Sequence, residues 1–95
     1  MNSRQRAYLI KLSHELTPIF QIGKEGVSPA LRDGVAEALA KREIVKINVL
    51  KNCFEDPKDL GILLSERTTS TLVKVIGRKI VLYKPAKEPK IQLPK

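Results

Sequence analysis

The chain of 95 residues has few of the side chains from which metal centres, disulfides and catalytic sites are built. Its one cysteine, Cys53, excludes a disulfide framework and a zinc site made of several thiolates, and it favours a reducing, cytoplasmic compartment. The one histidine, His14, lies far from Cys53 in the sequence, so the chain contains no local nucleophile–base pair. We therefore expect no enzyme activity, no metal, no cofactor and no small-molecule substrate.

Aromatic residues and long apolar runs are also scarce. Aromatic residues make up 4% of the chain and tryptophan is missing, which argues against the stacking platform that several RNA-binding sheets use. No apolar run approaches the roughly 20 residues that span a bilayer. The N-terminus lacks the apolar core of a secretory signal. We expect no membrane partner.

Acidic residues are outnumbered, 10 against 18 lysines and arginines, and the formal net charge is +8. The excess is uneven, because residues 1–24 carry +3, residues 25–70 carry −1 and residues 71–95 carry +6. Such a field favours a polyanionic partner, with nucleic acid ahead of an anionic membrane surface.

Capping signals predict three helices. Ser28-Pro29 and Asp56-Pro57 each place a capping side chain before a proline, which is typical of a helix start. Ser3 is expected to cap an N-terminal helix, and Thr17-Pro18 to end it, because a residue before proline avoids the helical region. The expected helices cover residues 4–17, 29–42 and 57–68.

Alternating side chains predict the strands. Val45, Ile47 and Val49 alternate with polar residues in the clearest of them. Gly77-Arg78 separates the last two, and glycine at the first central position fits a type II′ hairpin turn. The expected strands cover residues 19–22, 44–50, 71–76 and 79–83.

The order α-β-α-β-α-β-β predicts a single two-layer α/β domain with a four-stranded mixed sheet. We assign residues 1–84 to this domain. Residues 85–95 form a basic tail rich in proline and lysine, expected to be extended and either mobile or docked.

The Gly23-Lys24-Glu25-Gly26 loop is the motif most suggestive of binding. Two glycines let a sugar-phosphate backbone approach, and the amides at the start of the following helix can contact phosphates. Lys24, and Arg32 one turn into that helix, would add positive charge, whereas Glu25 opposes it. A plain strand-to-helix turn is the alternative interpretation.

The order and spacing of several segments resemble YhbY-type proteins, the bacterial stand-alone form of the CRM domain of RNA-binding proteins. The resemblance covers nearly the whole chain and is carried by Leu9–His14, Ile22–Val27, Arg42–Ile47, Val75–Lys84 and Lys90–Pro94.

The resemblance implies a fold like that of the C-terminal domain of translation initiation factor 3. It also implies association with precursors of the large ribosomal subunit. The family's RNA-contacting Gly-x-x-Gly loop falls on Gly23 to Gly26, and its basic N-terminal helix falls on Arg4, Arg6 and Lys11. Glu25 and the nearly neutral middle of the chain depart from a strongly basic pattern.

These observations lead to the hypothesis of a cytoplasmic RNA-binding protein that binds ribosomal RNA during large-subunit assembly. Lys46 and Lys74 are expected to form a sheet-side patch, and Lys87 and Lys90 a contact from the tail. The alternatives are a ribosome-associated protein-interaction module without direct RNA recognition, and a small enzyme or metal protein. The expected RNA-contacting residues are Arg4, Arg6, Lys11, Gly23, Lys24, Glu25, Gly26, Arg32, Lys46, Lys74 and Lys84.

Overall fold

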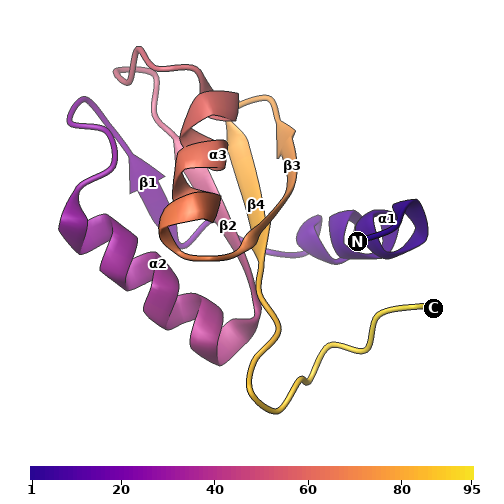
Figure 1. Ribbon diagram of the computed structural model, residues 1–95. Helices are drawn as coiled ribbons and strands as arrows, with labels where there is room; N and C mark the ends of the chain where they lie inside the picture. Colours follow the sequence, from indigo (N-terminus) through magenta and orange to yellow (C-terminus); the bar gives the residue numbers. More distant parts are fainter.

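A computed structural model describes residues 1–95 as three helices and a four-stranded sheet, so the predicted α/β class and element order are confirmed (Figure 1). No helix is both long and apolar enough to cross a membrane. The elements are α1 (Ser3–Ser13), β1 (Phe20–Ile22), α2 (Pro29–Arg42), β2 (Ile44–Val49), α3 (Pro57–Arg67), β3 (Thr71–Ile76) and β4 (Lys79–Tyr83).

Two of the three predicted helix starts are confirmed. The Ser28 side chain accepts the Leu31 amide at the start of α2, and the Asp56 side chain accepts the Lys58 amide at the start of α3. The cap of α1 was predicted one residue too late, because Asn2 and not Ser3 caps this helix. The side chains and backbone amides of Asn2 and Gln5 bond reciprocally in a capping box.

The end of α1 was also predicted wrongly. The helix stops at Ser13 rather than at Thr17, and His14 is its C-cap. The chain turns here because it must lead into β1, and the Lys46 ammonium of β2 holds the Ser13 carbonyl at 3.2 Å. A proline signal marks where a helix cannot continue, whereas this helix ends earlier, at the carbonyl that Lys46 binds.

The sheet is mixed, with strand order β1-β2-β4-β3. β1 runs parallel to β2, and β4 pairs antiparallel with both β2 and β3. The predicted hairpin is present. Gly77 has a φ of +59°, and Arg78 has no positive φ, as a type II′ turn requires.

Helices cover both faces of the sheet. α2 and α3 form one layer over a core that includes Ile47, Leu64 and Ile80. On the opposite face, α1 and two tail side chains, Ile91 and Leu93, cover a smaller core. This smaller core is made of Leu9, Ile44, Val73, Val81 and Tyr83.

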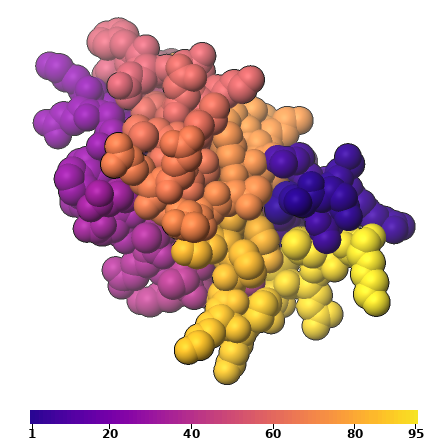
Figure 2. Space-filling model, viewed as in Figure 1, coloured from indigo at the N-terminus to yellow at the C-terminus, as the bar shows by residue number.

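The tail lies along α1 without forming a helix or strand (Figure 2). Glu43, directly after α2, is completely buried, and its carboxylate accepts the amides of Ala86, Lys90 and Ile91. The Glu43 carbonyl accepts the Lys84 amide at 2.8 Å. One buried carboxylate thus holds the segment that follows β4.

Candidate nucleic-acid interface

The Gly23–Gly26 loop is a tight turn between β1 and α2. The Gly26 amide donates to the Gly23 carbonyl at 3.0 Å, and Gly26 has a φ of +70°, a left-handed conformation that glycine adopts at little cost. Buried Ile22 anchors one side of the loop and the Ser28 cap anchors the other. Lys24 and Glu25 are exposed at its tip.

The loop between β2 and α3 lies beside this turn. A Cβ placed on Gly26 would lie 3.1 Å from the Glu55 carboxylate, and one on Gly23 would lie 3.4 Å from the Asn52 side-chain oxygen. This proximity brings Glu55, along with Glu25, to the tip that carries Lys24. The charge immediately around the turn is therefore mixed.

The β3–β4 hairpin joins the same end of the sheet through Arg78. Its guanidinium donates to the carbonyls of Val49 at 3.0 Å, Leu50 at 2.6 Å and Cys53 at 3.2 Å. Figure 1 shows the three connections together at the upper end of the sheet. We call this region, made of residues 23–26, 50–56 and 77–78, the loop end.

A groove of about 520 Å³ lies at the loop end, between the last residues of β2 and the hairpin. Three cations line it, namely Lys51, Arg78 and Lys79, and no carboxylate does. Sequence reasoning missed these three residues as candidate contacts. Only the pairing of β2 with β4 brings Lys51 close to the hairpin.

The groove continues onto the part of the sheet that α1 leaves open. The strand register sets Gln21, Asn48, Lys79 and Ile76 side by side across all four strands. Gln21 and Ile76 are exposed, and the other two are half-buried. We call this row, together with Lys46, Lys74 and the surface between them, the open sheet face.

The open sheet face is positively charged. Lys46, Lys74 and Lys79 all project from it, since the register places Lys46 and Lys74 opposite Val81 on the face that α1 covers in part. The four strands contain no aspartate or glutamate. The alternation of side chains along β2 predicted that Lys46 would lie on this face of the sheet. Nothing in the sequence indicated that Lys79 would lie on the same face.

Several side chains that were predicted to contact RNA make hydrogen bonds within the protein instead. Arg6 of α1 donates to the carbonyls of Leu72 and Val73, where β3 has an irregular register opposite β4. The Arg4 guanidinium lies 3.5 Å from the Lys95 carbonyl. Of the predicted basic stripe on α1, Lys11 is exposed, and its ammonium group has no ion-pair or hydrogen-bond partner.

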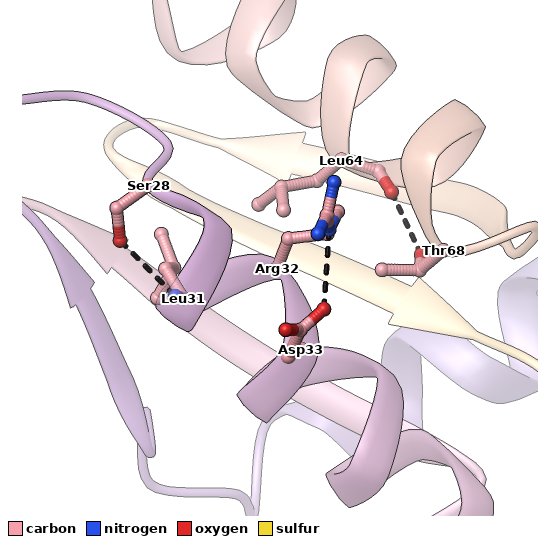
Figure 3. A network of polar contacts seen from close by, with 6 residues as sticks. All are labelled: Ser28, Leu31, Arg32, Asp33, Leu64 and Thr68. Atoms are coloured by element: carbon pink, nitrogen blue, oxygen red, sulfur yellow. Dashed lines mark hydrogen bonds and ion pairs between the residues drawn. The ribbon is translucent and has the colours of Figure 1, made fainter.

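Arg32 and Lys84 lie away from the open sheet face. Figure 3 shows the Arg32 side chain extending between α2 and α3, with its Nε 3.2 Å from the Asp33 carboxylate. Arg32 and Arg67 together line a groove of about 180 Å³ beside the start of α2. The Lys84 ammonium donates to the Thr68 carbonyl at 3.3 Å, at the end of α3.

The structure therefore separates the predicted residues into groups. Gly23, Lys24, Glu25 and Gly26 belong to the loop end, and Lys46 and Lys74 to the adjoining sheet face. The other candidates are spread over α1, α2 and the residue that follows β4. His14 is exposed at the end of α1 and Cys53 is buried in the core, so these two side chains form no site together.

Comparison with known proteins places these features in one family. Residues 1–84 match the model of the CRS1/YhbY (CRM) domain. The chain is 46% identical to the probable RNA-binding protein YqeI of Bacillus subtilis, over 99% of both chains. It is 30% identical to an RNA-binding protein of Haemophilus influenzae, over 100% of this chain and 96% of that one.

A solved structure agrees with this assignment. The solution structure of the hypothetical protein SAV1595 from Staphylococcus aureus superimposes with a TM-score of 0.84, at 43% identity and with 99% of both chains covered. The match extends over the helices, the sheet and the tail. This chain belongs to the CRS1/YhbY (CRM) domain family.

Proposed function

We propose that this protein binds RNA through the open sheet face and the adjoining loop end. The observation that carries the proposal is a four-stranded sheet whose open face carries three lysines and whose strands contain no acid, in a chain of net charge +8. Membership of the CRM family, with relatives named as RNA-binding proteins, supports RNA as the polyanion.

Binding in this proposal is mainly electrostatic. Lys74 and Lys79 neutralise phosphates over the sheet, and Lys24 and Lys51 do so at the loop end, each displacing counterions from the RNA. Gly23 leaves room for the sugar-phosphate backbone to approach. Contacts of this kind position a protein on RNA and respond to its shape, and they do not require base-specific recognition.

We further propose that the RNA is large-subunit ribosomal RNA or its precursor, bound in the cytoplasm during subunit assembly. This finer assignment is drawn from the implied association of YhbY-type proteins with large-subunit precursors. It assigns the chain a binding role rather than a catalytic one.

Charge-matched double variants test the interface. Replacing Lys74 and Lys79 with glutamine removes two cations from the open sheet face, whereas replacing Lys41 and Arg42 removes two exposed cations from the far end of α2. The first pair is expected to make the slope of log affinity against log salt shallower by roughly 1.4 to 1.8, at about 0.7 to 0.9 per phosphate contact. The second pair should leave the slope unchanged. Equal effects of both pairs would mean that the affinity for RNA depends only on the net charge of the protein.

Ultraviolet crosslinking in cells tests the identity of the RNA. The tagged protein is crosslinked and the attached RNA is sequenced. We expect peaks at one or a few sites of large-subunit ribosomal RNA, enriched in precursor particles. Crosslinks that follow RNA abundance would refute the assembly role. Crosslinks no stronger than those of an untagged control would instead favour a protein-interaction module.

A further inference from the structure

Phe54 is the most exposed large apolar side chain in the molecule. It is 95% exposed, whereas the other exposed large apolar residues lie between 38% and 49%. A phenyl ring left in water forfeits the free energy that its burial would provide. The ring therefore has a surface available for a partner.

The backbone on both sides of Phe54 is anchored. Cys53 is 4% exposed and belongs to the main core, and its carbonyl accepts a hydrogen bond from Arg78. Asp56 caps α3 by accepting the Lys58 amide at 2.9 Å. The ring is thus presented outward by a short anchored segment, and a partner need order little of the chain to bind it.

Phe54 also lies at the loop end, next to the proposed phosphate contacts. Its neighbour Glu55 faces Gly26 of the turn, and Asn52 of the same loop faces Gly23. Lys51 lines the groove three residues before it in the chain. The ring and one cation of the groove thus belong to the same short loop between β2 and α3.

The surroundings of the ring favour a nucleobase over a protein surface. Lys51, Asn52, Glu55 and Asp56 are all exposed polar residues, so the ring has polar neighbours on both sides along the chain. Protein interfaces centre on a contiguous apolar region with a polar rim. A single flat base needs only one ring to stack on, and every base has such a face.

We propose that Phe54 stacks on an unpaired base of the bound RNA. This inference rests on the proposed function and adds to it a preference for RNA with unpaired nucleotides. The flanking carboxylates of Glu55 and Asp56 repel phosphates, so the backbone lies toward Lys51 and the groove, which no carboxylate lines, and the base turns toward the ring.

A tryptophan at this position gives a direct readout, because the chain has no other tryptophan. The Phe54→Trp variant is titrated with an RNA hairpin that has an unpaired loop, with a fully paired RNA of the same length, and with heparin. We expect the hairpin loop to quench the fluorescence strongly. The paired RNA and heparin, which offer charge without an accessible base face, should bind with little quenching.

Affinity gives a second readout. The Phe54→Leu variant is expected to bind the hairpin RNA roughly 5- to 150-fold more weakly, the range for loss of one stacked base. Phe54→Tyr should restore most of the affinity, and the salt slope should stay that of the wild type because no charge changes. The matched control is Ile62→Ser, which changes an exposed apolar residue on α3, outside the loop that carries Phe54. This variant should leave the affinity unchanged.

The outcomes separate this inference from the proposed function. Stacking is refuted if Phe54→Leu binds the hairpin as tightly as the wild type does, or if it loses affinity equally for the hairpin and for the paired RNA. RNA binding would still stand in both cases. Equal quenching by heparin would refute stacking as well. If the wild-type protein binds neither RNA at low salt, the proposed function itself fails, and the stacking role fails with it.

Discussion

Glu43 shows how one residue can be held in an unfavourable conformation by the contacts it makes. It follows α2 with a φ of +67°, a position where glycine is the usual residue. The carboxylate compensates by accepting the amides of the tail. Burial raises the pKa of this carboxyl, but the hydrogen bonds from Lys90, Ala86 and Ile91 together bring the pKa below its ordinary value of 4.5.

This lowered pKa predicts that acid weakens the fold. Since the folded pKa lies below the unfolded one, the contribution of Glu43 is complete above the unfolded pKa and is lost as the pH falls through the folded value. Glu43→Gln should lower the free energy of unfolding by about 1 to 3 kcal/mol at neutral pH, because the tail amides lose a charged hydrogen-bond acceptor. Thermal unfolding at several pH values below neutral checks this. The variant should show a smaller acid-dependent loss than the wild type, and identical slopes would contradict the role of the carboxylate.

The two loop glycines are predicted to separate stability from binding. Gly26 requires a positive φ and faces the Glu55 carboxylate, so Gly26→Ala should cost about 1 to 2 kcal/mol of stability. Gly23 has no positive φ, and a Cβ there meets only the exposed Asn52 side chain and Leu50 at ordinary contact distances. Gly23→Ala should therefore fold normally and bind RNA more weakly. Urea unfolding and RNA titration of both variants test this, and undiminished RNA affinity in Gly23→Ala would argue against close approach of the backbone.

At the scale of the elements, α1 is attached to the sheet by cations from both sides. Arg6 of the helix donates to the β3 carbonyls of Leu72 and Val73, and Lys46 of β2 donates to the Ser13 carbonyl at the end of the helix. Hydrogen bonds from a charged donor are stronger than neutral ones. These two side chains are therefore partly committed to holding α1, which limits what they can offer to RNA.

This division of roles predicts opposite phenotypes for two cations of α1. Arg6→Gln should destabilise the protein by roughly 1.5 to 3 kcal/mol, because the β3 carbonyls lose a charged donor. Lys11→Gln removes an exposed, unpaired charge from the helix that borders the open sheet face, so it should leave stability unchanged and reduce RNA affinity only. Denaturant unfolding and RNA titration of each variant provide the comparison. A stable Arg6→Gln protein would mean that the contact to β3 contributes little.

For the whole molecule, the uneven charge predicts a steep dependence of binding on salt. If about five phosphates are neutralised, log affinity should fall with log salt at a slope of roughly −3.5 to −4.5. Titrations of a ribosomal RNA fragment over a series of potassium chloride concentrations measure this slope. A slope near zero would refute the electrostatic mechanism.

Local chemistry in the sequence was enough to predict most elements. α2, β3 and β4 have the predicted bounds, because a capping serine before a proline and a glycine in a hairpin turn act on neighbouring residues. The α/β class and element order followed from these signals. The Gly23–Gly26 loop was recognised in the same way, since its glycines are adjacent to the strand and helix that they join.

Which charges are free to bind, and where they meet, depends on how distant segments pack together. The pairing of β2 with β4 brings Lys79 beside Asn48, and the packing of α1 commits Arg6 and Lys46 to carbonyls far away in the sequence. The fold also buries Cys53 while leaving its neighbour Phe54 exposed. These outcomes depend on contacts between distant segments, whereas capping and turn signals act over a few residues. Signals between neighbouring residues therefore specify the elements and the composition specifies the excess of positive charge, whereas packing between distant segments specifies the surface on which that charge is presented.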